Sequence, residues 1–156
     1  MTGADQARQD AIRELLERVV EALGLQGTVE VSGDAETITG TVHGEQMGLF
    51  IGRHGQTIDA VQHLAHRAAL AASDEEPAPR VVVDAEGYRA RRSEALHRQA
   101  DDAADEAVRF GRPVALDAMT ASERRLVHEH LRDRDDVETY SEGDEPDRHL
   151  VVAPAA

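Results

Sequence analysis

The chain has 156 residues, 40% of them hydrophobic and 31% charged, which is typical of a globular protein and excludes a disordered one. It contains no cysteine, which excludes disulfides, thiol catalysis and thiolate metal sites. Its 31 acidic and 17 basic residues give a formal net charge of -14, so nucleic acid cannot be attracted by a basic field. Any contact with phosphates must therefore depend on a few placed arginines, since every basic residue is Arg.

Neither a membrane span nor a signal peptide is predicted. No apolar run approaches the length of a span, and the segment from Met1 to Gly24 is acidic and amphipathic. We therefore expect a cytoplasmic protein with no membrane insertion. With two Phe, two Tyr and no Trp, a row of aromatic side chains that stacks on bases is not expected either.

The first half of the chain alternates between helical and strand-like patterns. The predicted elements are a helix at 10–23, strands at 28–32 and 37–43, a helix at 56–71 and a strand at 80–85. The turn at Gly33-Asp34 predicts that the first two strands form an antiparallel hairpin, with Ile38 and Val42 facing inward. The buried stripe of the second helix is predicted to be Ile58, Val61, Leu64, Ala65 and Ala68.

A Gly-x-x-Gly segment precedes this second helix. Gly52 and Gly55 flank Arg53 and His54, and two glycines at this spacing allow a tight loop that other residues would form only with strain. The loop opens a helix, whose first N–H groups have no partner within the helix and lie at its positive end. Such a loop suits a phosphate, although by itself it is also a common turn before a core helix.

The second half predicts a long helix, a short helix and a C-terminal hairpin. A helix at 87–110 ends at Gly111-Arg112-Pro113, a short strand follows at 114–116, and a helix runs from a capping box at Thr120 and Glu123 to about residue 131. Strands are predicted at 137–141 and 148–152. The apolar side of the long helix is predicted to be Tyr88, Ala95, Leu96, Ala103, Ala107 and Val108.

Two groups of basic residues stand out in this half. Arg89, Arg91 and Arg92 lie at the start of the long helix, where cations oppose the helix dipole. We interpret them as a basic patch near nucleic acid, the alternative being a solvated surface paired with Glu86 and Glu94. On the short helix, Arg124 and His128 are four residues apart and so share a face that can hold a phosphate or stack on a base. The alternative for that pair is an ordinary surface helix.

The first half resembles a bacterial KH domain, in the order of its elements and in the sequence from Leu49 to Leu64. In KH domains the Gly-x-x-Gly loop clamps the backbone of unpaired nucleotides. The resemblance implies that Arg53 faces a phosphate, that His54 donates to a phosphate or sugar, and that Ile51 and Ile58 line an apolar groove under the bases. The implied RNA-binding residues here are Ile51, Gly52, Arg53, His54, Gly55 and Ile58.

The second half resembles the C-terminal R-3-H domain of the Jag family, which is associated with single-stranded nucleic acid. The resemblance rests on Met119-x-x-x-Glu-Arg-Arg-x-x-His128 followed by Ser141-Glu-Gly-x-Glu-Pro-x-Arg148. Jag proteins join a KH domain directly to this domain. The resemblance implies binding roles for Arg124, His128 and the neighbouring Arg125; we add Arg148, which approaches the helix if the hairpin packs beside it.

Together these patterns predict an α+β protein of two small domains, a KH domain at 1–85 and an R-3-H domain at 86–156. Because the predicted KH helix lies near the start of the sequence, we expect the separate N-terminal domain of many Jag proteins to be lacking here. We expect a non-catalytic protein that binds single-stranded RNA or DNA, as a post-transcriptional regulator or RNA chaperone, with no cofactor and no metal. The resemblance also implies links to cell division, cell shape and cell-wall growth.

Two other functions remain open from the sequence. The first is a protein-interaction module that pairs with a second small KH-domain protein, which the resemblance suggests as a partner. The second is a nuclease that uses His and carboxylates, such as those near His63-x-x-His66 and His128-x-His130. These clusters are expected to arise by chance among eight His and 31 acidic residues, and no P-loop or zinc-protease motif is present.

Overall fold

The structure is a computed structural model that describes all 156 residues, and its fold is α+β, as predicted. It divides into two compact units, Met1–Arg89 and Ala90–Ala156. The predicted domain boundary after Ala85 lies just before α4 (Tyr88–Phe110), the helix in which this division falls. No helix combines the length and the apolar character that are needed to cross a membrane.

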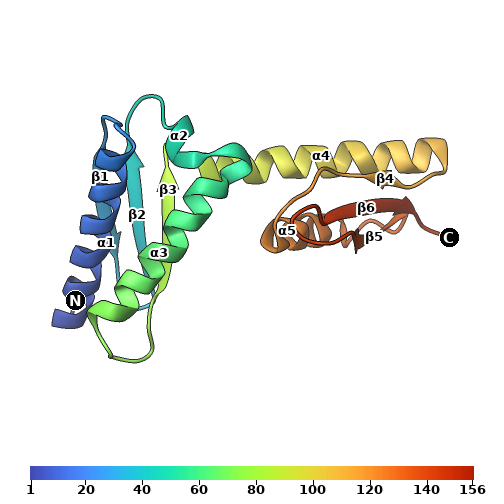
Figure 1. Cartoon of the computed structure of the whole chain (residues 1–156). Helices are drawn as coiled ribbons and strands as arrows, with labels where there is room; N and C mark the ends of the chain where they lie inside the picture. The colour runs from blue at the N-terminus through green and yellow to red at the C-terminus, as the bar shows by residue number, and fades with distance from the viewer. The chain divides into compact units, whose positions relative to one another are not determined.

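The first unit is a three-stranded sheet with two helices on one face (Figure 1). The strand order is β1-β2-β3, with β1 antiparallel to β2 and β2 parallel to β3, so the predicted hairpin is confirmed. Ile38 and Val42 of β2 are fully buried, as predicted. The elements are α1 (Gly3–Ala22), β1 (Thr28–Gly33), β2 (Thr37–His43), α2 (Gly48–Ile51), the 3-10 turn η1 (Arg53–Gly55), α3 (Gln56–Ala72) and β3 (Arg80–Ala85).

Helix α1 begins seven residues earlier than the predicted start at Asp10, because a capping box fixes its first turn. The Thr2 hydroxyl accepts the Asp5 N–H, while the Asp5 carboxylate accepts the Thr2 N–H. In the added turns, Arg8 is buried and donates to the carbonyl oxygens of Ser73 and Glu75. The apolar periodicity missed this segment because one of its inward-facing side chains is an arginine.

The buried stripe of α3 differs from the prediction at two positions. Ile58, Val61 and Ala65 are buried as predicted, but Leu64 is 52% exposed, and Ala69 rather than Ala68 completes the stripe. At 3.6 residues per turn, position 64 falls on the solvent side of α3, although its side chain is apolar. The same error occurs in α4, where Val108 is exposed and Ala100 and Ala104 are buried instead.

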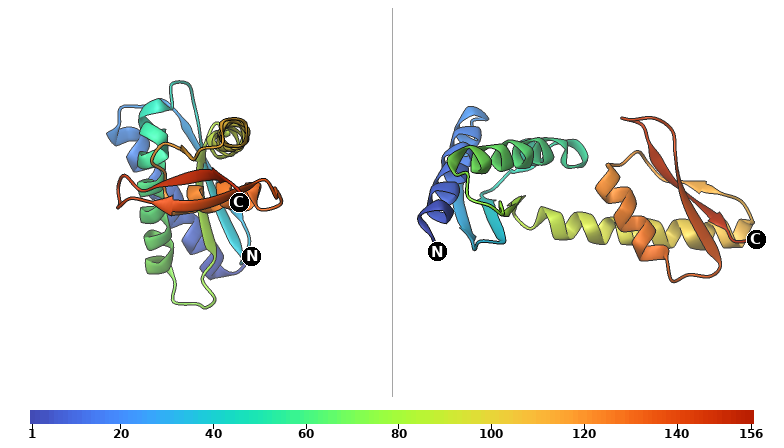
Figure 2. Two further views of the ribbon diagram at one scale, coloured as in Figure 1. Left: turned by 90° about the vertical axis from the view of Figure 1, so that its right-hand side faces the viewer. Right: turned by 90° about the horizontal axis from the view of Figure 1, so that it is seen from below.

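The second unit packs a long helix and a short helix against a small antiparallel sheet (Figure 2). The strand order is β4-β6-β5, and β5 and β6 form the predicted hairpin. Leu96 of α4, Val127 and Leu131 of α5, and Leu150 and Val152 of β6 meet in its core. Besides α4, the elements are β4 (Val114–Ala115), α5 (Ala121–Leu131), β5 (Val137–Glu142) and β6 (His149–Pro154).

Candidate nucleic-acid interface

The Gly-x-x-Gly loop connects α2 to α3 through three residues with positive φ. Gly52 has φ 75° and ψ 175°, His54 has φ 54°, and Gly55 is left-handed at φ 79°. A Cβ atom on Gly52 would lie 2.2 Å from the Thr57 hydroxyl oxygen, and one on Gly55 would lie 2.5 Å from the Tyr88 hydroxyl oxygen. Both positions therefore require glycine, for backbone conformation and for space.

The beginning of α3 lacks a side-chain cap. Gly55 is its N-cap residue and has no side chain with which to accept a hydrogen bond from the first helical N–H groups. These donors lie at the positive end of the helix macrodipole, where an anion is stabilised. Within the loop the Gly55 N–H donates to the Gly52 carbonyl oxygen and the Gln56 N–H to that of Arg53, so a phosphate site here depends on the N–H groups of α3 that follow Gln56.

Arg53 and His54 lie between the two glycines and are both exposed. Neither side chain makes a hydrogen bond or an ion pair within the protein, so both are free to meet a ligand. The prediction that Ile58 lines a groove under the bases is wrong, because its side chain is fully buried in the core. Ile51 is only partly buried and keeps exposed surface beside the loop.

The basic patch predicted at the start of α4 is not formed by Arg89 or Arg92. The Arg89 guanidinium lies 2.6 Å from the Asp59 carboxylate on α3 and also donates to the Val83 carbonyl oxygen. Arg92 lies 2.8 Å from the carboxylate of Glu123. Both arginines thus pair with carboxylates that are distant in the sequence. The predicted alternative considered only the neighbouring Glu86 and Glu94.

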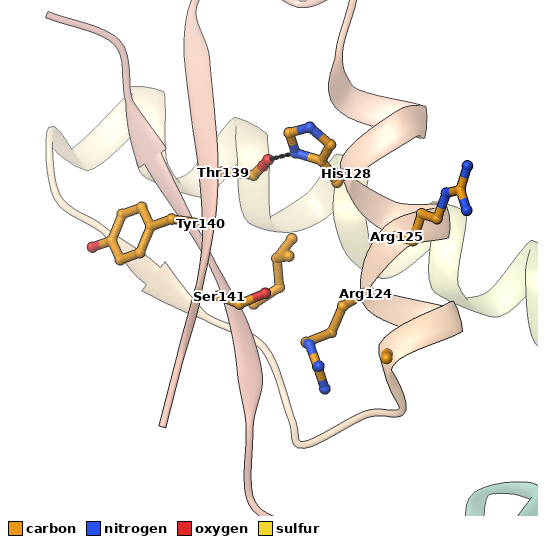
Figure 3. A pocket seen from close by; sticks show the side chains of 8 residues that line it. Arg124, Arg125, His128, Thr139, Tyr140 and Ser141 are labelled. Carbon is orange, nitrogen blue, oxygen red and sulfur yellow. Dashed lines mark hydrogen bonds between the residues drawn. The ribbon is translucent and has the colours of Figure 1, made fainter. Parts of the chain in front are cut away.

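Arg124 and His128 are both on α5, as predicted, and both line one pocket, but Arg124 is not exposed (Figure 3). The side chain of Arg124 is 10% exposed, and its guanidinium donates to the Met119 carbonyl oxygen at 2.7 Å. It also forms an ion pair of 3.0 Å with Glu145 in the turn between β5 and β6. Arg124 therefore connects the start of α5 to this turn.

The pocket has a volume of about 380 Å³ and lies between α5 and β5. His128 is exposed, and its Nδ1 is hydrogen-bonded to the Thr139 hydroxyl. The Arg125 side chain is 80% exposed and pairs with Glu129 one turn later, an ion pair that contributes little at such exposure. Figure 3 shows Thr139 and Ser141 directed toward α5, whereas the Tyr140 ring points away from it.

Arg148 does not line this pocket. It lies just before β6, and its guanidinium donates to the Gly143 carbonyl oxygen at 2.6 Å, across the turn of the hairpin. Its backbone contacts the segment that precedes α5, since the Arg148 carbonyl oxygen accepts the Met119 N–H. The side chain thus stabilises the turn, and the prediction that it reaches α5 is not met.

Sequence reasoning missed Thr139 and Ser141 as pocket residues. Both lie in the predicted strand 137–141, and its period of two places Val137, Thr139 and Ser141 on one face. That face is the inner one, because Val137 is buried. The signal was therefore present, but the position of α5 beside this strand depends on tertiary packing.

The histidines noted in the sequence have separate surroundings. The His130 ring lies 2.9 Å from the Asp101 carboxylate and stacks on His97 with ring centroids 4.2 Å apart, whereas His128 is bonded to Thr139. No group of three His or acidic side chains is placed to hold a metal ion.

Two carboxylates outside the candidate sites have a lowered pKa. Hydrogen bonding by the Arg134 guanidinium lowers the pKa of Asp136, and the N–H groups of Thr37 and Glu36 lower that of Asp34.

Comparison with known proteins supplies the family. Residues 9–83 match the family described as "KhpA/KhpB, KH domain", and residues 94–154 match the R-3-H domain family. The chain is 35% identical over 147 residues to a protein of Clostridium symbiosum named "RNA-binding protein KhpB", covering 93% of this chain and 65% of the relative. The chain belongs to the KhpB-type family of KH plus R-3-H proteins. The predicted pair of domains is thereby confirmed.

Other relatives of the same name agree with this assignment. The protein of Lactiplantibacillus plantarum is 36% identical over 155 residues, covering 94% of this chain and 46% of the relative. That of Bacillus subtilis is 32% identical over 140 residues, covering 88% and 66%. The chain thus spans between about half and two thirds of the length of these KhpB-type relatives.

Proposed function

We propose that this chain is a non-catalytic protein that binds single-stranded RNA. The observation that carries the proposal is the Gly52–Gly55 loop, where the exposed and unpaired side chains of Arg53 and His54 lie beside a helix start that no side chain caps. In KH domains this loop clamps the backbone of unpaired nucleotides. The names of the relatives support the proposal, since each is called an RNA-binding protein.

In the proposed complex, the first site holds the RNA backbone by its phosphates. The amides that open α3 donate to a phosphate, and Arg53 adds a charge-assisted hydrogen bond. The second site is the pocket beside α5, where Arg125 and His128 are available to the ligand while Arg124 maintains the shape of the pocket. Two linked sites of low affinity bind one strand more tightly through effective concentration.

The proposal is tested with the double variant Arg53→Ala/His54→Ala, which removes both hydrogen-bonding side chains between the two glycines. These side chains have no partners in the protein, so the fold is preserved. We expect the affinity for a labelled single-stranded RNA pool to fall about tenfold or more, the loss of one or two hydrogen bonds between charged groups. Arg18→Ala is the matched control, because it removes an exposed arginine from α1. Equal RNA affinities of the double variant and wild type would remove the loop from the interface.

The absence of catalysis is part of the proposal and has its own test. We expect the chain to leave single-stranded RNA intact during long incubation with Mg²⁺. If RNA is cleaved and His128→Ala abolishes the cleavage, the protein is an enzyme that acts at the α5 pocket. The Arg125→Ala variant separates the two roles, because it weakens RNA binding without removing a group that can exchange a proton at neutral pH.

We place this activity in the cytoplasm, where bacterial RNA is made, in a post-transcriptional regulator or RNA chaperone. Single-stranded DNA is a competing ligand, because the phosphate contacts do not depend on the 2′-hydroxyl. Links to cell division, cell shape and cell-wall growth follow from the resemblance to Jag proteins. Deletion of the encoding gene, with cell dimensions measured by microscopy, tests these links; unchanged dimensions contradict them.

Pairing with a second small KH-domain protein is a second candidate function, favoured by two exposed leucines. Leu49 on α2 is 59% exposed and Leu64 on α3 is 52% exposed, in a unit that buries most of its other large apolar side chains. Light scattering after size exclusion measures self-pairing, and mixing with a purified KH protein measures hetero-pairing. Leu64→Asp abolishes either complex if this surface is the interface, and leaves it intact if it is not.

A further inference from the structure

Strand β5 has an unpaired edge beside the α5 pocket. The strand order β4-β6-β5 places β5 at the end of its sheet, with β6 on one side only. Thr139, Tyr140 and Ser141 of this strand line the pocket together with Arg124, Arg125 and His128 of α5. The pocket wall therefore includes three residues of this edge strand.

The hydrogen-bond pattern identifies which groups face outward. The Ala155 N–H donates to the Asp136 carbonyl oxygen at 2.9 Å, so this facing pair is hydrogen-bonded. In an antiparallel ladder such pairs alternate with pairs whose backbone groups point away from each other. Glu138, Tyr140 and Glu142 thus turn their backbone groups toward β6, whereas Thr139 and Ser141 turn theirs to the free edge.

The other side of β6 confirms this pattern. The Leu116 N–H donates to the Leu150 carbonyl oxygen at 2.9 Å, so Leu150 turns its backbone groups toward β4. Leu150 is the partner of Ser141 in the register with β5. A residue of β6 cannot face β4 and β5 at once, so the backbone N–H and C=O of Ser141 remain without a partner in the protein.

We propose that this free edge binds the hydrogen-bonding edge of an unpaired base. The N–H and C=O of one strand residue are a donor and an acceptor side by side, and every base carries an acceptor next to a donor on its Watson–Crick edge. In a duplex that edge is occupied by the opposite base. The proposal rests on the proposed function and makes the α5 pocket selective for single strands, with Arg125 and His128 holding the phosphate or sugar of the same nucleotide.

The charge of the pocket favours a nucleotide over a protein strand at this edge. A free strand edge also pairs with a peptide strand, and that mode needs no charge. Here the edge lies beside two arginines and a histidine, on a chain whose net charge is -14. Two arginines and no acidic side chain in the pocket lining are complementary to a phosphate-bearing ligand. Arg124 pairs with Glu145 and Arg125 with Glu129, but neither carboxylate lines the pocket, and the exposed Arg125–Glu129 pair is weak enough for a phosphate to replace Glu129.

The variant Ser141→Pro tests the proposal because proline removes the outward N–H and leaves the ladder to β6 unchanged. Proline is tolerated on an edge strand when its nitrogen faces solvent. Ser141→Ala is the matched control, since it loses the hydroxyl but keeps the N–H. We expect Ser141→Pro to lower the affinity of the full chain for a short single-stranded RNA pool about fivefold, and Ser141→Ala to lower it by less than about twofold.

Amide resonances of the ¹⁵N-labelled wild-type chain give a readout at the site itself. With the RNA pool, the N–H resonances of Thr139 and Ser141 should shift more than that of Tyr140, which is bonded to β6. Shifts confined to the Gly52–Gly55 loop, or equal affinities of the Ser141→Pro variant and wild type, would overturn the edge contact and leave RNA binding intact. The absence of any shift would contradict RNA binding itself, and the edge contact with it.

Discussion

The Gly52–Gly55 loop and the α5 pocket both contain an arginine and a histidine, but they present them differently. In the loop, Arg53 and His54 have no partner and project into solvent from a backbone that only glycine permits. In the pocket, Arg124 is buried between the Met119 carbonyl oxygen and Glu145, and His128 is bonded to Thr139. The first site is defined by its backbone, and the second by a network of side chains.

This contrast shows that a residue named in a motif can act as scaffold or as ligand contact. Arg124 belongs to the Arg-x-x-x-His pattern, yet its guanidinium already has two partners in the protein. Its neighbour Arg125 is not one of the two residues of that pattern, but its side chain is 80% exposed. Hence removal of an arginine should affect stability at one position and RNA affinity at the next.

The largest effect is expected for Gly55→Ala, which introduces a side chain into the backbone-defined site. The added Cβ would lie 2.5 Å from the Tyr88 hydroxyl oxygen, at a residue with φ 79°. Left-handed backbone and overpacking together should lower the free energy of unfolding of the first unit by about 3 kcal/mol. Urea denaturation followed by circular dichroism measures this loss.

The double variant Gly55→Ala/Tyr88→Phe refines this first prediction. Removing the hydroxyl relieves the closest contact, whereas the ring carbons, 3.0 and 3.1 Å from the added Cβ, stay. Stability should therefore return in part relative to Gly55→Ala alone. If Gly55→Ala is as stable as wild type, the loop does not depend on glycine at this position, and the contrast between the two sites is lost.

The next largest effect is expected from Arg124→Ala compared with Arg125→Ala. The first variant leaves the Met119 carbonyl oxygen and Glu145 without their partner, and it should lower the free energy of unfolding of the second unit by about 2 kcal/mol. The second variant should change that free energy by less than about 0.5 kcal/mol, because it removes an exposed ion pair. RNA binding, measured on the folded proteins, should weaken in Arg125→Ala.

The opposite result has a clear meaning. Arg124→Ala could instead unfold at the same urea concentration as wild type and lose RNA affinity. In that case Arg124 leaves Glu145 in the complex and binds a phosphate instead. Glu145→Gln distinguishes these accounts further, since it removes the charge that competes with RNA for Arg124. We expect the RNA affinity of Glu145→Gln to remain within about twofold of wild type, because the Met119 contact still holds the guanidinium.

The smallest effect is expected from acid, and it concerns two carboxylates outside both sites. The pKa of Asp34 is lowered by the N–H groups of Thr37 and Glu36, and the pKa of Asp136 by Arg134. A lowered pKa stabilises the folded chain above the ordinary carboxyl pKa of about 4, and this stabilisation is lost as pH falls through the folded value. The stability difference between wild type and Asp34→Asn or Asp136→Asn should shrink below about pH 4. A difference that is constant from about pH 7 to about pH 2 would contradict these assignments.

The sequence predicted most of the fold because its elements carry strong local signals. The capping box at Thr120 and Glu123, the end of the long helix before Gly111 and the alternation in the hairpins all appear where expected. Leu64 and Val108 were misplaced because an apolar residue on a solvent face has the same identity as one in the core. Periodicity alone does not distinguish the two.

The two candidate sites were predictable to different degrees, because one depends on adjacent residues and the other on contacts between distant ones. The Gly52–Gly55 loop is encoded by adjacent residues, so its tight turn could be predicted from the sequence. The partners of Arg89, Arg92 and Arg124 lie 30, 31 and 21 positions away, at Asp59, Glu123 and Glu145. Only the tertiary structure brings these carboxylates to them, and only it places β5 beside α5.

The salt dependence of RNA binding is the decisive measurement for these two sites. If a few placed groups hold single-stranded RNA on a chain of net charge -14, the logarithm of the association constant should fall only gently with the logarithm of salt concentration, with a slope of about -2 for about three phosphate contacts. Arg53→Ala should make this slope shallower by about 0.7, and Arg18→Ala should not change it. No binding at any salt concentration, or a slope that Arg53→Ala leaves unchanged, would contradict the account.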